Sequence, residues 1–192
     1  MSVLRVLAFT VLSAAVAAAL PDQIRLGNLK AFLNAPSAEA RGKLMADDYH
    51  FYFNERKGDG GSKEKSLSSY DNWDGPLHPD IKIRDYRIES DVWTISIIEL
   101  NDFAKLIGFP GWKATETVTF DADNLVREVI YVPIESGKDY KEYLKPAVVW
   151  LEANRPDELK QVYDLDKKRL IQTNASAKKW VELLTEWRDA TK

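Results

Sequence analysis

The sequence contains no cysteine and only two histidines. Without cysteine the chain can form neither a disulfide nor a thiolate metal site, so its stability must come from core packing. Glycine and proline number 9 and 8 among 192 residues, which excludes collagen-like and low-complexity proteins. Acidic residues number 30 and basic residues 27, and the resulting net charge of -3 gives no overall attraction for nucleic acid.

The first 19 residues are typical of a signal peptide. Arg5 supplies a positive charge, an uncharged run follows at residues 6–19, and this run ends in small residues. The run is shorter than the ~20 residues that cross a bilayer. We therefore expect cleavage near Leu20 and a secreted or periplasmic protein that has no membrane contact after cleavage.

The rest of the chain predicts one α+β domain. Apolar residues recur at helical spacing after Pro21, and Ser37 can cap a second helix. A strand rich in aromatic residues is expected at 49–53, and a short helix at 62–73. Further strands are expected at about residues 81–88, 92–100, 112–121 and 125–132. After Pro133 the pattern is helical to the end of the chain.

Two segments are informative beyond this order of elements. They are residues 44–51, Leu-Met-Ala-Asp-Asp-Tyr-His-Phe, and residues 117–125, Thr-Val-Thr-Phe-Asp-Ala-Asp-Asn-Leu. Together with the element order between about Pro21 and Pro133, they resemble the nuclear transport factor 2-like superfamily, which includes the SnoaL-like polyketide cyclases. The resemblance implies a cone-shaped, curved antiparallel sheet wrapped on N-terminal helices around an apolar cavity. Residues 20–136 would form this domain, and residues 137–192 a helical extension packed on it.

The superfamily contains enzymes as well as binding and dimerising domains. A catalytic member is expected to carry an Asp, or a His-Asp pair, that points into the cone. The strand at 125–132 has no Asp at the place where the cyclases often hold an acid–base carboxylate, which argues against cyclase-type chemistry.

The hairpin between the last two strands decides which side chains face inward. A three-residue loop at 122–124, with Asn124 in the left-handed conformation, is favoured by its turn chemistry. One face then carries Trp112, Ala114, Glu116, Val118, Phe120, Val126, Glu128, Ile130 and Val132. A loop of two or four residues instead groups Glu116 with Leu125, Arg127, Val129 and Tyr131.

Glu116 faces inward in either register and is the first candidate for acid–base chemistry. Burial among apolar side chains would raise its pKa toward neutrality, and the alternative is a structural Glu satisfied by a neighbour. His50 and His78 are the only imidazoles that could assist it. His50 shares a strand face with Asp48 and Tyr52, which is also the pattern of a solvated face. His78 lies in a proline-rich loop, where an exposed or structural role is the alternative.

Aromatic side chains are numerous enough to line a ligand cavity or to form the core. The candidate ligand-binding residues are Tyr49, Phe51, Trp73, Trp93, Trp112, Phe120 and Glu128. No cofactor is expected, and no metal, because His and Cys ligands at workable spacing are missing. We expect a non-catalytic domain that binds a small apolar or aromatic molecule, with a homodimer possible. The alternatives are an acid–base lyase, isomerase or hydrolase of the SnoaL-like type that uses Glu116 with a His or a second carboxylate, and a protein-interaction module.

Overall fold

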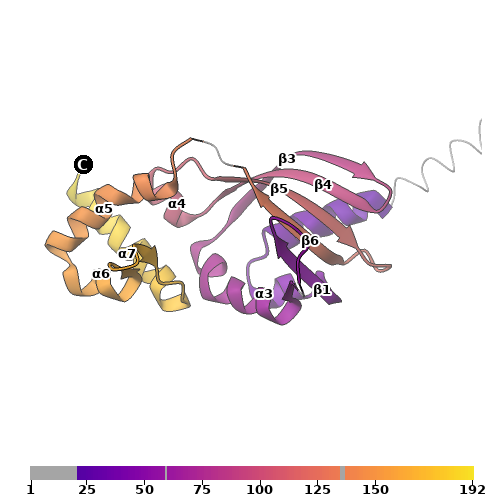
Figure 1. The fold of residues 1–192 in the computed structure, drawn as a ribbon, viewed down its shortest axis with the longest axis horizontal. Helices are drawn as coiled ribbons and strands as arrows, with labels where there is room; N and C mark the ends of the chain where they lie inside the picture. The colour runs from indigo at the N-terminus through magenta and orange to yellow at the C-terminus, as the bar shows by residue number, and fades with distance from the viewer. Residues whose placement is uncertain (1–20, 59, 135–136) are drawn as a thin grey trace, which may run out of the picture.

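The computed structural model describes residues 21–58, 60–134 and 137–192 of the chain. The predicted signal peptide lies outside these residues. The molecule is elongated, with a six-stranded curved sheet at one end and the C-terminal helices at the other (Figure 1). The predicted α+β class, with a curved sheet wrapped on N-terminal helices and followed by C-terminal helices, is confirmed. Among the described residues, no helix has the length and apolar character needed to cross a membrane.

The sheet has the strand order β2-β1-β6-β5-β4-β3. Its strands are β1 (Met45–Phe53), β2 (Gly61–Ser62), β3 (Asp80–Glu89), β4 (Val92–Leu100), β5 (Trp112–Phe120) and β6 (Val126–Pro133). Strands β3 to β6 form the predicted antiparallel meander, and their ends lie within one or two residues of the predicted ones. β1 pairs with β6 in parallel, so the sheet is mixed and not wholly antiparallel. A parallel pair needs a long crossover connection, and the chain supplies one through α3 and the meander.

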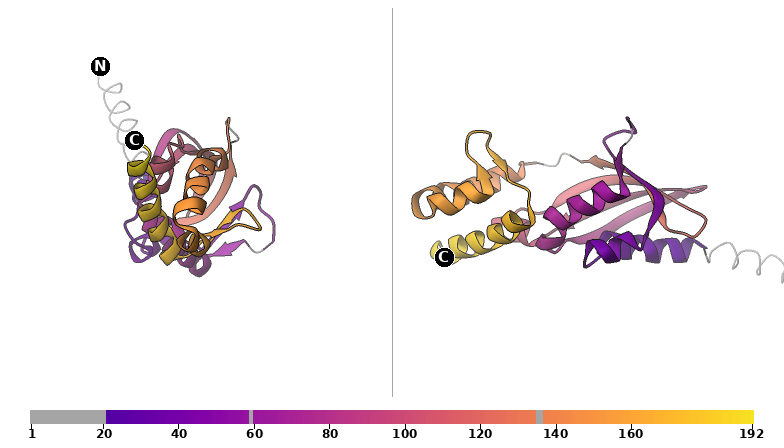
Figure 2. Two further views of the ribbon diagram at one scale, coloured as in Figure 1. Left: turned by 90° about the vertical axis from the view of Figure 1, so that its left-hand side faces the viewer. Right: turned by 90° about the horizontal axis from the view of Figure 1, so that it is seen from below.

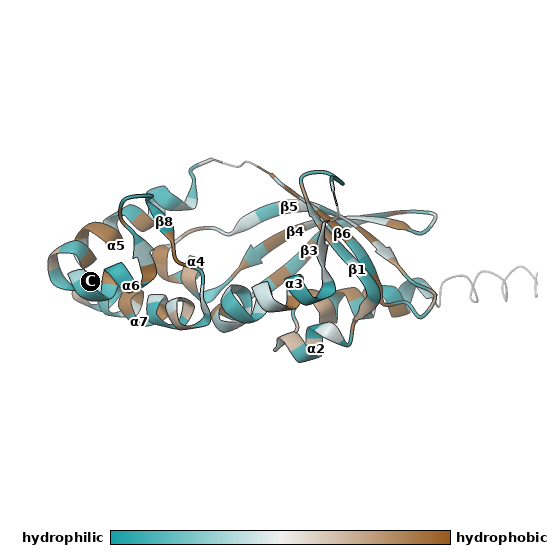
Figure 3. Ribbon diagram, turned by 60° about the horizontal axis from the view of Figure 1, so that its bottom comes forward, coloured by the Kyte–Doolittle hydropathy of each residue, from teal (hydrophilic) through white to brown (hydrophobic). Residues whose placement is uncertain are grey.

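Helices cover one face of the sheet. The first helix occupies residues 21–33, and it lies with α3 (Lys63–Ser69) across the inner, concave side (Figure 2). The short helix α2 (Ala38–Gly42) connects this helix to β1, and the Ser37 side chain caps it as predicted, accepting a hydrogen bond from the Ala40 amide at 3.1 Å. Leu29, Phe32 and Leu33 of the first helix are each at most 1% exposed, because they pack against apolar residues of the strands. Apolar and polar residues are interspersed along the strands (Figure 3).

The hairpin between β5 and β6 has the predicted three-residue loop and one feature that was not predicted. Asn124 takes the left-handed conformation with φ 62°, and the Asp121 amide donates to the Leu125 carbonyl at 3.0 Å. Phe120 pairs with Val126, but Thr119 pairs with Glu128, so Arg127 is an extra residue in a β-bulge.

The bulge reverses the side-chain alternation of β6. Val129 pairs with Val118 and Tyr131 with Glu116, so Val129 and Tyr131 share the inner face with Glu116. The prediction that Glu128, Ile130 and Val132 share that face is wrong. The alternative register, with a loop of two or four residues, placed Arg127 on the inner face with Glu116. This placement is also wrong, because Arg127 is exposed. A single extra residue moves every later side chain of a strand to the other face.

The C-terminal helices have a core of their own. They are α5 (Tyr140–Asn154), α6 (Pro156–Val162) and α7 (Asn174–Ala190), and the two-stranded hairpin β7 (Tyr163–Asp164) and β8 (Arg169–Leu170) joins α6 to α7. Their core includes Trp180, which is fully buried, and it extends to Leu77 and to Phe103 of α4 (Asp102–Ile107). The helical end is therefore fastened to the segments that connect the strands.

Candidate functional site

A pocket of about 360 Å³ lies where the inner face of the sheet meets the C-terminal helices. Most of its lining is aromatic: Phe51, Phe53, Trp73, Phe103, Trp112, Tyr131 and Tyr140. The other lining residues are Asp74, Glu99, Asn101, Leu170 and Gln172. An apolar concavity with a few polar side chains is the usual form of a small-molecule site.

The strand pairing explains how the sheet contributes to this pocket. Glu116 of β5 lies between Ile95 of β4 and Tyr131 of β6 in one row across the inner face. Glu99 pairs with Trp112, and both line the pocket. The row of Glu116 therefore lies on the same face of the sheet as the carboxylate and the indole that open to the pocket.

Glu116 is the most deeply buried carboxylate of the described chain. Its side chain lies in the apolar core with the residue only 5% exposed, and Oε2 has no hydrogen-bond partner among the described residues. Burial raises the pKa of Glu116 to about 7, and the positive charge of Arg41 opposes this rise. The predicted inward position and raised pKa of Glu116 are both found.

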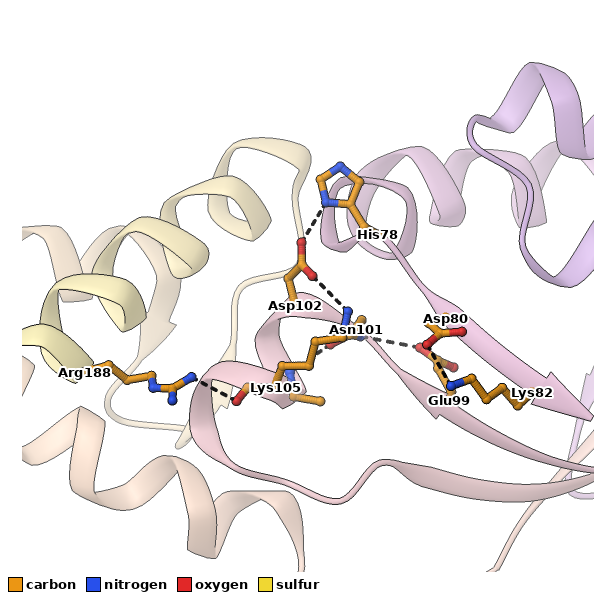
Figure 4. A network of polar contacts seen from close by, with 9 residues as sticks. His78, Asp80, Lys82, Glu99, Asn101, Asp102, Lys105 and Arg188 are labelled. Atoms are coloured by element: carbon orange, nitrogen blue, oxygen red, sulfur yellow. Dashed lines mark hydrogen bonds and ion pairs between the residues drawn. The ribbon is translucent and has the colours of Figure 1, made fainter. Parts of the chain in front are cut away.

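Two further carboxyl groups with raised pKa values, Glu99 and Asp74, line the pocket, and Glu99 interacts electrostatically with both Asp74 and Glu116. Burial raises the pKa of Glu99 to about 7, and the negative charges of Asp74 and Glu116 add to the rise. Arg41 opposes it, as does Asn101, whose side-chain amide donates to Glu99 Oε1 at 3.5 Å (Figure 4). The pKa of Asp74 is raised by burial against the same Arg41 charge. Strong pKa perturbation in a cleft is typical of functional sites.

Arg41 is the only cation that acts on all three carboxyl groups in the described chain. Its guanidinium lies 3.9 Å from the ring centroid of Phe32 and 4.9 Å from that of Tyr70. It also donates to the Phe32 carbonyl at 3.0 Å. Within the described chain, Arg41 forms no ion pair with any of the three carboxylates. Its charge lowers the pKa of each one, but burial has the larger effect and each pKa stays above its ordinary value.

Tyr131 contributes a phenol to the same site. Its ring stacks on Phe53 with centroids 5.7 Å apart, and both rings line the pocket. Burial, together with the negative charges of Glu99, Glu116 and Asp74, raises the pKa of Tyr131 to about 12. The hydroxyl therefore remains protonated at neutral pH and can donate a hydrogen bond to a ligand.

Neither histidine lies with Glu116. His50 pairs with Glu128 on the outer face of the sheet, and its Nδ1 lies 2.9 Å from the Asp48 carbonyl oxygen. His78 is exposed at the end of η2 (Gly75–Leu77), with Nδ1 2.8 Å from the Asp102 carboxylate (Figure 4). A mechanism that combines Glu116 with an imidazole therefore has no support in the geometry.

The predicted ligand-binding residues fall into three groups. Phe51, Trp73 and Trp112 line the pocket. Tyr49, Trp93 and Phe120 are between 1% and 8% exposed and belong to the core beneath the sheet. Glu128 lies on the outer face and forms an ion pair with Arg56. Trp93 and Phe120 lie at the ends of β4 and β5 that are remote from the pocket, whereas Trp112 lies at the opposite end of β5 and lines the pocket.

Sequence reasoning missed Asp74 and Glu99. Glu99 had a signal, because Trp93, Ile95 and Ile97 alternate along one face of β4 and Glu99 is the next residue of that face. Asp74 had none. It ends the π-helical turn η1 (Tyr70–Asp74), and its position depends on how that turn packs against the sheet. In the described ranges, no group of three or more candidate ligands could hold a metal ion.

Comparison with known proteins yields similarity of fold only. No family model matches the sequence, and no curated protein matches it. The chain is similar to a computationally designed 17-OHP binder, with 17% identity, a TM-score of 0.46, and coverage of 58% of this chain and 90% of the other. It is also similar to Delta 5-3-ketosteroid isomerase from Mycobacterium sp., with 19% identity, a TM-score of 0.43, and coverage of 58% and 91%. A third similar structure is RV0760c from Mycobacterium tuberculosis in complex with estradiol-17beta-hemisuccinate. Its identity to this chain is 15%, the TM-score is 0.44, and the match covers 58% of this chain and 92% of the other. Structures described as NTF2-like and as SnoaL-like also match.

Proposed function

We propose that this chain binds a small, mainly apolar molecule in the pocket between the sheet and the C-terminal helices. The observation that supports the proposal is the lining itself, in which seven of twelve residues are aromatic. Aromatic rings offer large apolar contact area to a ligand, and the few polar groups can fix its orientation.

A thermal-shift screen with a panel of small aromatic compounds tests this proposal. A ligand that binds the folded chain raises its melting temperature in a concentration-dependent way. The pocket variant is Phe53→Ala, whose residue is 58% exposed, and the matched control is Tyr86→Ala, whose residue is 48% exposed and lies outside the pocket. We expect Phe53→Ala to reduce the ligand-induced shift and Tyr86→Ala to leave it unchanged. Equal effects of the two variants, or a panel without any shift, would contradict the proposal.

A second candidate function is acid–base catalysis on such a ligand. It is favoured by one observation, the two glutamates with pKa values of about 7, because a group that titrates near neutrality can both accept and donate a proton. The test follows deuterium incorporation next to the carbonyl group of aromatic ketones in heavy water. Loss of exchange in Glu99→Gln, with ligand binding retained, would support catalysis. Exchange equal to that of the buffer alone would leave only the binding function.

We further propose that the protein is exported and that it forms a homodimer. Arg5 and the uncharged run after it support a secreted or periplasmic location. Amino-terminal sequencing of the protein recovered outside the cytoplasm tests this, and a start near Leu20 is expected. Sedimentation velocity tests the homodimer. Neither result bears on the pocket.

A further inference from the structure

The charge of the pocket lining is strongly one-sided. Asp74 and Glu99 open to the pocket, and its described lining contains no Lys, Arg or His. Glu116 lies behind them with one carboxylate oxygen buried and unpartnered within the described chain. Arg41, the cation that acts on these three carboxyl groups, lies against the rings of Phe32 and Tyr70 and donates to a backbone carbonyl. The negative groups therefore have no positive partner across the pocket.

Aromatic rings line the same pocket as the carboxylates of Asp74 and Glu99. Trp73 lies next to Asp74 in η1, and Trp112 pairs with Glu99 across the sheet. Phe103 packs against Trp73 with ring centroids 6.2 Å apart, and Tyr140 packs against Trp112 at 6.1 Å. The face of an aromatic ring carries negative electrostatic potential, so it attracts a cation that approaches it. Rings and carboxylates thus favour the same kind of ligand.

From this combination we infer that the ligand of the pocket is an organic cation, an amine or quaternary ammonium compound with an apolar body. The inference rests on the proposed function and names its ligand class. The ammonium group would lie among the rings near Glu99 and Asp74, and the apolar body would contact Phe51, Phe53 and Tyr131. A ligand that is apolar throughout would leave the carboxylates of the pocket without a positively charged partner.

The raised pKa of Glu99 agrees with this inference. The pKa of Glu99 is about 7 because burial and the negative charges of Asp74 and Glu116 disfavour its ionised form. The charge of Arg41 and the hydrogen bond from Asn101 favour the ionised form but are weaker. A bound cation would favour the ionised form and lower that pKa. Below neutral pH the cation must therefore displace a proton from the carboxyl group to solvent, so its affinity rises with pH until the carboxylate is ionised.

The test compares two compounds of the same shape. One is benzyldimethyl(hydroxyethyl)ammonium, whose charge does not depend on pH, and the other is the uncharged alcohol in which carbon replaces the nitrogen. Binding of each compound to the protein is measured by isothermal titration calorimetry at about pH 8 and about pH 6. We expect the cation to bind at least ~10-fold more tightly than the alcohol at the higher pH. Its affinity should fall about tenfold at the lower pH, whereas that of the alcohol should not change.

Two variants locate the effect. Glu99→Gln keeps the shape of the side chain and removes its charge, and the control Glu89→Gln removes an exposed carboxylate that pairs with Arg87 outside the pocket. We expect Glu99→Gln to abolish most of the preference for the cation while it still binds the alcohol, which reports intact folding. Glu89→Gln should retain the preference.

The outcomes separate this inference from the proposed function. Equal or tighter binding of the alcohol overturns the organic-cation inference and leaves a pocket for neutral ligands. Failure of both compounds, in a protein that binds neutral compounds of the aromatic panel, also overturns it. Failure of both compounds and of the whole panel overturns the proposed function itself. If Glu99→Gln still binds the cation more tightly than the alcohol, the cation binds elsewhere on the protein. That result would refute the proposed position of the ammonium group near Glu99.

Discussion

The substitution Glu116→Gln tests the electrostatics of the buried site directly. Glu116 keeps its proton in the folded protein up to about pH 7, whereas in the unfolded chain it ionises near its ordinary value of 4.5. Between these two values the folded state binds more protons than the unfolded state, so Glu116 lowers the stability of the protein as pH rises. The gap corresponds to roughly 3 kcal/mol once the carboxyl group is ionised in both states.

Urea unfolding followed by tryptophan fluorescence measures this effect. Gln cannot ionise, so the variant should lack the share of the pH dependence that belongs to Glu116. Between about pH 5 and about pH 8, the free energy of unfolding of the wild type should fall by roughly 2–3 kcal/mol more than that of the variant. The new amide donor has no partner at the position of Oε2, which lowers stability by about the same amount at every pH. The slope with pH is therefore the decisive quantity.

The exposed control Glu89→Gln should follow the wild type across this range. Glu99 should respond to the substitution as well, because the charge of Glu116 is one cause of its raised pKa. In Glu116→Gln the pKa of Glu99 should fall, which carbon-detected nuclear magnetic resonance of the carboxyl group can follow. A wild type and variant with parallel stability curves would refute the assignment of a raised pKa to Glu116. So would a wild type that gains stability relative to the variant as pH rises.

Three further substitutions test the fold, each by urea unfolding. Asn124→Ala should cost about 1–2 kcal/mol, because Asn124 holds φ 62° and accepts a hydrogen bond from Arg25 Nε at 3.1 Å, and Asn124→Gly should cost less. An Ala variant as stable as the wild type would contradict the hairpin geometry. Trp180→Ala should cost about 3–5 kcal/mol, since Trp180 is fully buried at the centre of the helical core, and a loss below ~1 kcal/mol would contradict that position. Thr173→Ala should cost about 1 kcal/mol by removing the capping box that Thr173 forms with Ser176 at the start of α7, whereas the exposed Thr191→Ala should cost much less.

The sequence was most informative where one local rule determined the outcome. Alternation along β5 placed Glu116 inward in either register, and the structure agrees. The chemistry of residues 122–124 predicted the loop length and the left-handed Asn124. These features depend on neighbouring residues, so no tertiary information was needed to find them.

Features that arise from tertiary contacts were not predictable in the same way. The pocket joins β1, η1, β4, α4, β5 and β6 to the C-terminal segment that contains α5 and β8, and each element carries only one or two of its residues. Asp74 and Glu99 are 25 positions apart in the chain, and only the packed sheet gives them a common environment. The histidines were attractive for their chemistry, but a strand face and a loop position do not decide whether a side chain meets the cavity. His50 and His78 lie outside it.

The bulge at Arg127 shows how one residue connects the fold to the site. Thr119 pairs with Glu128 and Phe120 with Val126, so β6 gains a residue between these two pairs. Without the extra residue, a strand that begins with Val126 facing inward would also turn Glu128 inward and Tyr131 outward. Glu116 would then have a second carboxylate beside it on the inner face, and the pocket would lose a phenol. The bulge removes Glu128 to the outer face, where Arg56 pairs with it, and gives the ligand pocket an aromatic ring in its place. The composition of the site thus depends on a β-bulge that the side-chain pattern of β6 does not predict.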